Sequence, residues 1–243
     1  MGRVAIAPPR ACGRLLRQHR PKATAVVVTG PPAAGKSTAV SRLLAAHDSV
    51  LHFKVRVHFQ ALLAAGHPVA VGIEAQIKAR DQLSDATVAW GFDNFIATGA
   101  GATHVLVEGY PRNAAQLNDM RAVAEERDVM LGGLVIFDAP DAVLRQRARN
   151  RLACFQCDVT ADGGVSLTCP RCGGTLTSRP DDSPNQLASR ISQFRRTRRQ
   201  MEEMFRRYGK VVTLNAQRTT DELAADLGRV LACMGGIELR HER

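Results

Sequence analysis

The sequence predicts an α/β fold with a central parallel sheet, and two observations carry this prediction. Short apolar segments alternate with amphipathic helical segments along the chain, which is the pattern of strands joined by crossover helices. The first apolar segment, residues 25–29, also runs into a glycine-containing turn that opens directly into a helix. We therefore expect a three-layer architecture in which helices cover both faces of the sheet.

The strands of this sheet are short apolar runs bounded by turn residues. Residues 25–29 form the first strand, and residues 104–107, 134–137 and 211–214 are strands of the same kind. Residues 50–100 are expected to be mostly helical. Helices also fill the other intervals between these strands.

Several of the helices have recognisable starting signals. Apolar residues recur at helical spacing over residues 113–127 and again from Pro140 to about residue 151. Ser183-Pro184 combines an N-cap with a first-turn proline and opens a long helix. Thr219-x-x-Glu222 is a capping box that opens the final helix.

The composition is that of an ordinary globular protein: 45% of the 243 residues are hydrophobic and 23% are charged. No apolar run approaches the roughly 18 residues that a membrane-spanning helix needs, so no membrane partner is expected. The net charge of +10 favours polyanionic partners, either nucleic acid or phosphate-rich small molecules. Nucleic acid is the weaker candidate, because aromatic residues make up only 5% of the chain and no stacking platform is visible.

The N-terminal segment is basic, since no acidic residue precedes Asp48. It lacks the continuous apolar region of a secretory signal peptide. An organelle transit peptide and a disordered basic extension both fit this composition, and we expect an extension over residues 1–23. We expect the protein to be a cytoplasmic monomer.

Residues 30–37, Gly-Pro-Pro-Ala-Ala-Gly-Lys-Ser, match the phosphate-binding loop G-x-x-x-x-G-K-[ST] between a strand and a helix. Backbone N–H groups of such a loop wrap around the β-phosphate at the positive end of the helix dipole. Lys36 reaches the β- and γ-phosphates, and the hydroxyl of Ser37 or Thr38 contacts Mg²⁺ or phosphate. This motif predicts the P-loop NTPase fold with Mg²⁺ and ATP as ligands. The residues assigned to ATP are Gly30, Ala33, Ala34, Gly35, Lys36, Ser37 and Thr38.

Two C-x-x-C pairs contain Cys154, Cys157, Cys169 and Cys172. Paired turns of this kind bring four thiolates onto a tetrahedral zinc ion. Because four protein ligands leave no open position, we expect the Zn²⁺ to be structural. Redox chemistry is the alternative, although no thioredoxin-like context surrounds the pairs.

Several motifs occur in a consistent order around these two features. They are Glu-Gly-Tyr-Pro-Arg-x-x-x-Gln at residues 108–116, Asp-Ala-Pro at residues 138–140 with Arg147 and Arg151 after it, and Arg-Pro-Asp-Asp at residues 179–182 with Arg190 after it. With the phosphate-binding loop and the cysteine pairs, this succession resembles the adenylate kinase family in its zinc-lid form. The resemblance covers residues 24–48 and residue 104 to the C-terminal region.

The resemblance implies an acceptor site and a set of arginines around the transferred phosphate. Arg112, next to Gly109, would hold the acceptor phosphate, and Gln116 would read the acceptor base. Gln116 also has a second interpretation, as the residue that closes a capping box with Asn113. Glu108 either holds a water molecule on Mg²⁺ or is a structural carboxylate.

By the same resemblance, Arg147 and Arg151 would lie against the ATP phosphates, while Arg179 and Arg190 would move in on closure. Planar arginine side chains suit phosphoryl transfer, which needs positive charge around the equatorial oxygens. The catalytic residues would be Lys36, Arg112, Arg147, Arg179 and Arg190. The other arginines of these helices are expected to be solvated, namely Arg145, Arg149, Arg195, Arg196, Arg198, Arg199, Arg206 and Arg207.

The chain departs from the family after the second strand. Where adenylate kinases have T-G-D-x-x-R, residues 53–59 here read Phe-Lys-Val-Arg-Val-His-Phe. Either Lys54 or Arg56 replaces the missing arginine and contacts the acceptor, or His52, Lys54, Arg56 and His58 form the polar face of a strand. Ala33 and Ser37 also stand where the family usually has glycine.

These observations favour an ATP-dependent nucleoside monophosphate kinase whose partners are ATP and a phosphorylated small molecule. One alternative is a small-molecule kinase that phosphorylates a hydroxyl, with Glu108 or Asp85 as base. A nucleic-acid-stimulated ATPase is a third hypothesis. Beyond the N-terminal extension, we expect three parts: a kinase core (residues 24–48, 104–152 and 183–243), a helical acceptor-binding insert (residues 49–103) and a zinc lid (residues 153–182).

Overall fold

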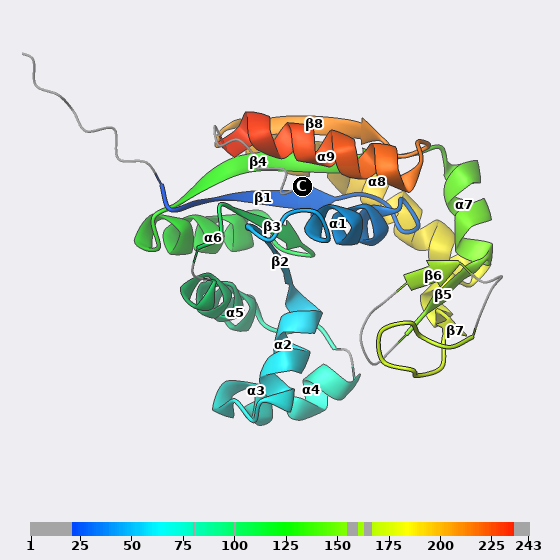
Figure 1. Cartoon of the computed structure of the whole chain (residues 1–243), viewed down its shortest axis with the longest axis horizontal. Coiled ribbons are helices and arrows are strands. Elements are labelled where there is room, and N and C mark those ends of the chain that lie inside the picture. The colour runs from blue at the N-terminus through cyan, green and yellow to red at the C-terminus, as the bar shows by residue number, and fades with distance from the viewer. Residues whose placement is uncertain (1–20, 80, 100, 155–159, 163–166, 236–243) are drawn as a thin grey trace, which may run out of the picture.

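The computed structural model describes residues 21–235 except residues 80, 100, 155–159 and 163–166. Residues 1–20 of the expected basic extension lie outside this range. At the centre is a five-stranded parallel sheet in the order β2-β3-β1-β4-β8 (Figure 1). Its strands are β1 (Ala23–Thr29), β2 (Val50–Lys54), β3 (His104–Glu108), β4 (Val129–Asp138) and β8 (Lys210–Asn215).

Helices cover both faces of the sheet, and each face has its own apolar core. One face packs against α1 (Lys36–Leu44) and α9 (Thr220–Gly235). The opposite face packs against α5 (Asp85–Thr98), α6 (Ala114–Glu126) and the C-terminal half of α8 (Pro184–Arg206). The prediction of an α/β P-loop fold with a parallel sheet between two helical layers is therefore confirmed.

A helical insert separates β2 from α5 and projects away from the sheet (Figure 1). It consists of α2 (Val55–Ala64), α3 (Pro68–Gly72) and α4 (Glu74–Ala79), which share a small core of Phe59, Ala70 and Ile77. The mostly helical character predicted for residues 50–100 is confirmed.

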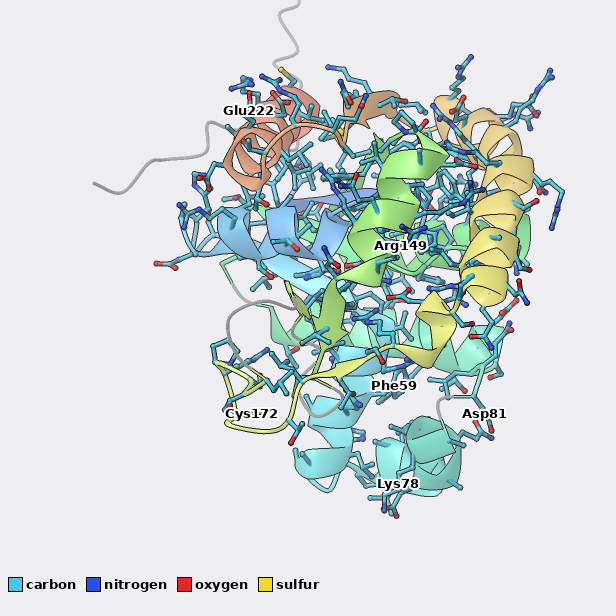
Figure 2. The ribbon with its side chains drawn as sticks, turned by 90° about the vertical axis from the view of Figure 1, so that its right-hand side faces the viewer. Phe59, Lys78, Asp81, Arg149, Cys172 and Glu222 are labelled. Carbon is cyan, nitrogen blue, oxygen red and sulfur yellow. The ribbon has the colours of Figure 1, made fainter. Side chains whose placement is uncertain are left out.

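A second projection follows α7 (Asp141–Arg149) and contains the cysteine pairs. It is a small antiparallel sheet in the order β6-β5-β7. Its elements are β5 (Arg151–Ala153), β6 (Thr160–Asp162), β7 (Thr177–Ser178) and the 3₁₀ turn η1 (Pro180–Asp182). Figure 2 shows Cys172 of this projection and Phe59, Lys78 and Asp81 of the insert region on the same side of the molecule, away from Glu222 of α9.

One alternative from the sequence is wrong. β2 ends at Lys54 and α2 begins at Val55 without an intervening loop. Arg56 and His58 therefore lie on a helix, and the four basic residues from His52 to His58 do not form the polar face of one strand. Lys54 remains at the end of β2, where it is in register with Glu108 of β3.

The parallel strands end along one edge of the sheet, and this edge carries the polar residues of interest. Lys54, Glu108 and Asp138 are the last residues of β2, β3 and β4, and the phosphate-binding loop follows β1. Ligands of open α/β sheets bind at this edge. Within the described part of the chain, no helix combines the length and apolar character needed to cross a membrane.

Candidate active site

The phosphate-binding loop between β1 and α1 requires glycine at two positions. A side chain at Gly30 would meet the carbonyl oxygen of Phe137 at 2.4 Å, and Gly35 caps α1 with a left-handed φ of 79°. The first turn of α1 contains no acidic residue, and its N-cap makes no side-chain hydrogen bond. The positive end of the α1 dipole is therefore open to an anion. Ala33 shares the left-handed conformation, with a φ of 62°.

Lys36 lies inside this loop. Its Nζ donates hydrogen bonds to the carbonyl oxygens of Gly30 and Pro31, each at 2.9 Å. Burial lowers the pKa of Lys36 to about 8, and the positive charges of Arg151, Arg190 and Lys54 act in the same direction, while Glu108 opposes them. Several cations thus converge on the loop, which suits a polyanionic ligand.

Glu108 ends β3 beside the phosphate-binding loop. It accepts a hydrogen bond from Ser37 Oγ at 3.3 Å, and His52 Nε2 lies 3.3 Å from its second oxygen. Burial alone would raise the pKa of Glu108, but the contact with His52 and the charges of Lys54 and Lys36 lower it to about 2. An ionised carboxylate next to a hydroxyl offers the oxygen ligands that Mg²⁺ prefers.

A cavity of about 520 Å³ opens next to Ser37 and Glu108, between the sheet edge, the insert and the lid. Its walls include apolar side chains of α2, α4 and α5, such as Phe59, Ile77 and Val88. The residues that the sequence analysis assigned to the acceptor all line it, namely Lys54, Arg56, Gly109, Arg112, Gln116, Arg179 and Arg190.

The segment between β3 and α6 holds Arg112 and Gln116 in place. Arg112 Nε donates to the carbonyl oxygen of Gly109 at 2.9 Å. Asn113 caps α6 by accepting the N–H of Gln116 at 2.8 Å. The side chain of Gln116 does not return to Asn113, so the reciprocal half of a capping box is not formed. It bonds instead to the backbone N–H of Arg112 at 2.6 Å and to Asp85 Oδ1 at 2.7 Å.

The arginines of α7 differ in exposure, and α7 ends at Arg149, so Arg151 lies on β5 and not on the helix that was expected to run to about residue 151. Arg145 and Arg149 are exposed, whereas Arg147 is partly buried and donates to the carbonyl oxygen of Ala216 at 2.6 Å. A Cβ added at Gly35 would lie 3.9 Å from Arg147 Nη1, so this guanidinium is next to the phosphate-binding loop. Of the other residues assigned to ATP, Ala34 is buried and Thr38 is exposed.

Two of the three arginines around the lid pair with carboxylates of η1, and the third bonds to a threonine hydroxyl. Arg151 forms a two-point ion pair with Asp182, at 2.8 Å from Nε and 2.5 Å from Nη2. Arg190 Nη1 lies 3.5 Å from a carboxylate oxygen of Asp181 and 3.9 Å from one of Asp182. Arg179 donates to Thr160 Oγ1 at 3.2 Å. These contacts join the lid strands, η1 and the start of α8 into one polar network.

The cysteines of the lid meet as a metal site requires. The sulfur atoms of Cys154, Cys169 and Cys172 all lie within 4.8 Å of one another, and the Cys154 and Cys172 sulfurs are 3.4 Å apart. Tetrahedral zinc with Zn–S bonds of about 2.3 Å places its sulfur ligands about 3.8 Å apart. The described thiols therefore fit zinc. Cys157, the fourth ligand predicted, lies outside the described residues.

The sequence analysis missed two features around this site. Arg195 and Arg198 of α8, expected on a solvated face, turn toward the sheet and both pair with Asp138. Arg195 also pairs with Asp141 at 3.0 Å. The contact of Asp85 with Gln116 was missed as well. Both features join residues far apart in the chain, and no local pattern marks them.

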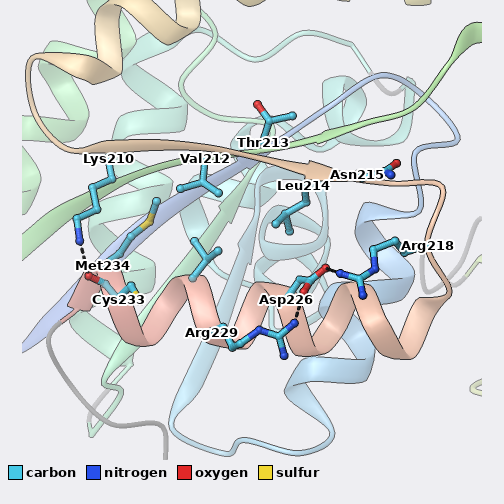
Figure 3. Close-up of a pocket in the computed structure, with 11 residues that line it drawn as sticks. Lys210, Val212, Thr213, Leu214, Asn215, Arg218, Asp226, Arg229, Cys233 and Met234 are labelled. Atoms are coloured by element: carbon cyan, nitrogen blue, oxygen red, sulfur yellow. Dashed lines mark hydrogen bonds and ion pairs between the residues drawn. The ribbon is translucent and has the colours of Figure 1, made fainter.

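A second hollow lies between β8 and α9 (Figure 3). Its charged side chains are paired within the hollow: Lys210 with the carbonyl oxygen of Cys233 at 2.8 Å, and Arg218 and Arg229 with Asp226. None of the residues predicted for the active site line it. The candidate active site is therefore the cavity beside the phosphate-binding loop.

Comparisons of the sequence with known proteins show what this chain is similar to. The family model of the AAA domain matches residues 26–155, just over half of the chain. The chain is 25% identical to an adenylate kinase of Novosphingobium aromaticivorans, over 85% of this chain and 98% of the relative. It is 27% identical to an adenylate kinase of Symbiobacterium thermophilum, over 83% of this chain and 95% of the relative. The chain therefore belongs to the AAA domain family, and its similarity to adenylate kinases extends over most of its length.

Proposed function

We propose that this chain is an ATP-dependent nucleoside monophosphate kinase, which transfers the γ-phosphoryl group of ATP to the phosphate of a nucleotide. The observation that carries the proposal is the position of the cations. Lys54, Arg56, Arg112, Arg179 and Arg190 all line one cavity, which opens directly beside Ser37 and Glu108 of the donor site. The similarity to adenylate kinases supports a nucleotide as the acceptor.

On the donor side, the phosphate-binding loop holds ATP through its backbone N–H groups and Lys36. Lys36 exchanges its bonds to the carbonyl oxygens of Gly30 and Pro31 for phosphate oxygens. Ser37 and Glu108 would hold Mg²⁺, which would supply positive charge to the phosphates. Arg147, next to Gly35, lies against the same phosphates.

On the acceptor side, Arg112 and Arg56 hold the acceptor phosphate, and Lys54 lies between the two sites. An oxygen of this phosphate attacks the γ-phosphorus, the bond to the β-phosphate oxygen breaks, and ADP and a nucleoside diphosphate are formed. The second pKa of a phosphate is roughly 6, so the attacking oxygen is already anionic at neutral pH and no protein base is needed.

A hydroxyl acceptor would need a base, and the two carboxylates predicted for that task are poorly suited. The pKa of Glu108 is lowered to about 2, which makes it a weak proton acceptor. Asp85 is engaged with Gln116 at 2.7 Å. These two observations favour the phosphate acceptor over the hydroxyl-directed kinase.

The proposed lid contains a structural zinc ion held by Cys154, Cys169 and Cys172, with Cys157 as the fourth ligand. Such an ion supplies folding energy to a small sheet that has little apolar core of its own. Thiolate ligands persist in a reducing compartment, and we propose that the protein acts in the cytoplasm.

A panel of acceptors tests the proposed function. ADP formation from ATP is measured with nucleoside monophosphates, with the matching free nucleosides, and with DNA and RNA. Phosphorylation of monophosphates but not of free nucleosides is the expected result. Equal turnover of free nucleosides would show a hydroxyl-directed kinase, and ATP hydrolysis stimulated by nucleic acid would support the third hypothesis.

A further inference from the structure

His52 lies in the middle of β2, the strand next to β3 in the sheet (Figure 1). It is in register with Leu106 of β3, two residues before Glu108. Side chains along a strand alternate between the two faces of a sheet, and neighbours in register share a face. Val50 and Leu106 belong to the core on the α1 face, whereas Phe53 belongs to the opposite core. The side chain of His52 is therefore on the same face of the sheet as Glu108 and α1.

On this face the imidazole of His52 meets the carboxylate of Glu108. His52 Nε2 lies 3.3 Å from Glu108 Oε2, and only 15% and 14% of the two side chains are exposed. Ser37 Oγ contacts the same carboxylate, at 3.3 Å from Oε1 and 3.5 Å from Oε2. The carboxylate thus has one neighbour on α1 and another on β2.

The contact between His52 and Glu108 is close, but it is not aligned as a hydrogen bond. His52 Nε2 is inaccessible to solvent and, within the described part of the chain, no acceptor meets hydrogen-bond geometry with it. A carboxylate only accepts hydrogen bonds, so the nitrogen beside it carries the hydrogen. Because a buried donor without an aligned acceptor costs free energy, a small rotation that brings Oε2 onto Nε2 is favourable.

Ser37 and His52 differ in what they can do for Glu108 when a metal ion is present. The proposed function places Ser37 at Mg²⁺ itself, so its hydroxyl moves when the ion binds and gives no fixed support. His52 is in the middle of a strand and is not among the residues that line the cavity. It can therefore keep its place behind Glu108 whether the ion is bound or not.

We infer that His52 is a positioning residue for the proposed Mg²⁺ site. It holds Oε2 of Glu108 from behind, so that Oε1, on the side of Ser37, stays turned toward the ion. Groups that bond a metal ligand in this way typically raise metal affinity without touching the metal. The inference rests on the proposed function and goes beyond it, because it assigns a residue outside the cavity to the affinity for the ion.

The test measures binding rather than turnover. The Kd of the non-hydrolysable imido analogue of ATP is measured by titration calorimetry, without acceptor, in EDTA and at increasing Mg²⁺ concentrations. His52→Leu removes the N–H donor and keeps an apolar side chain. It is expected to leave the Kd in EDTA unchanged and to raise the Mg²⁺ concentration for the half-maximal effect by about ten- to a hundredfold. A merely structural change would weaken binding in EDTA as well.

Two amide variants separate the donor from the bulk of the side chain. His52→Gln carries an N–H donor at a reach similar to that of Nε2, so it should restore most of the Mg²⁺ effect. His52→Asn has the same amide on a shorter side chain that stops short of Glu108, so it should resemble His52→Leu. His67→Leu, which replaces the histidine that caps α3 in the insert, is the control and should leave the Mg²⁺ dependence unchanged.

A variant of Glu108 shows whether His52 acts through that carboxylate. In Glu108→Gln the anionic ligand is already lost, so adding His52→Leu should not weaken the Mg²⁺ effect further. An equal further loss in this background overturns the inference, and so does an unchanged Mg²⁺ dependence in folded His52→Leu or His52→Asn. If the analogue does not bind the wild-type protein, or if Mg²⁺ does not strengthen its binding, the proposed donor site fails and the inference fails with it.

Discussion

The proposed donor and acceptor sides of the cavity differ in what determines their conformation. On the donor side the conformation is determined mainly by the backbone. Gly30 and Gly35 allow the turn of the phosphate-binding loop, and Lys36 donates hydrogen bonds to carbonyl oxygens of the same loop. On the acceptor side the cavity is formed by long side chains that come from separate elements. Lys54 lies at the end of β2, and Arg56 is exposed on α2. The proposed donor site therefore depends on one local segment, whereas the proposed acceptor site depends on side chains from separate elements.

The largest loss of kcat is expected when Lys36 is removed from the donor side or Arg112 from the acceptor side. Lys36→Ala and Arg112→Ala should each lower kcat by about a thousandfold with the fold intact, since each removes charge from the transferred or accepting phosphate. Initial rates of ADP formation and a thermal unfolding curve are the measurements. Lys22→Ala and Arg121→Ala, which are away from the cavity, serve as controls. Near-normal turnover of either active-site variant would remove that residue from the proposed machinery.

Substitutions of Lys54 and Arg56 sharpen the comparison. Lys54→Ala and Arg56→Ala should each raise the KM of the acceptor by about ten- to a hundredfold, and the KM for ATP should stay unchanged in Arg56→Ala. Lys54→Ala should also lower kcat, because Lys54 is in register with Glu108 and its charge acts on Lys36. Lys78→Ala, an exposed lysine of the same insert, is the control. An equal effect on both KM values in Arg56→Ala would contradict the separation of the two sides.

The proposed zinc ion should affect stability more than chemistry. Freshly purified protein is expected to contain one Zn²⁺ per chain, and Cys172→Ser should lower both the zinc content and Tm. Elemental analysis and thermal unfolding measure these changes, with Cys233→Ser on α9 as the matched control. Protein without stoichiometric zinc, or a Tm that does not respond to Cys172→Ser, would refute the assignment.

The two sides should also differ in their response to pH. The pKa of Lys36 is lowered from 10.5 to about 8, so its charge is present below pH 8 and lost as the pH rises through that value. Arginine keeps its charge throughout this range. kcat/KM for ATP should therefore fall by up to about tenfold between pH 7 and 9, as the charged fraction of Lys36 falls. kcat/KM for the acceptor at saturating ATP should change less, and a parallel fall of both would contradict this prediction.

The smallest effect concerns Ala33. Its φ of 62° costs a residue with a Cβ about 1 kcal/mol, and glycine removes this strain at some cost in unfolded-state entropy. Ala33→Gly should raise Tm by about 1–3 °C. Ala34→Gly should lower Tm, because Ala34 is buried and is not among the described residues with positive φ. Thermal unfolding of both variants decides whether the strain is real.

Most of the fold was predictable because its signals are local. The capping box at the start of α9 is an example, since Thr219 N–H donates to the Glu222 carboxylate and the N–H of Glu222 donates to Thr219 Oγ1. The boundary between β2 and α2 was harder. Residues 55–59 alternate apolar and polar and include β-branched valines, which favours a strand by pattern. The structure makes them helical, and Phe59 is the buried residue of that helix.

The candidate site likewise contains some residues whose places the local sequence predicts and others whose places it does not. The phosphate-binding loop and Arg112 belong to contiguous motifs, so their places were predictable. The pairing of Asp138 with Arg195 and Arg198, and of Asp85 with Gln116, depends on which elements meet in space. From the sequence alone, Arg195 and Arg198 belong to a basic helix and Asp85 stands in no motif, so neither pairing is indicated. Distant pairings of this kind decide which arginine is structural and which is available to a ligand.

The attachment of α8 to the sheet has a mechanical consequence. Arg195 and Arg198, in the middle of this helix, form ion pairs with Asp138. Phe205, near the C-terminal end of the helix, is buried in the core. The N-terminal half of α8 carries Arg190, connects to the lid, and buries Leu187 and Ile191 in the core that also contains Leu144 of α7. Tilting this helix would pull both side chains out of that core. The helix is therefore a fixed post about 34 Å long, at a rise of about 1.5 Å per residue, to which the lid is attached at one end.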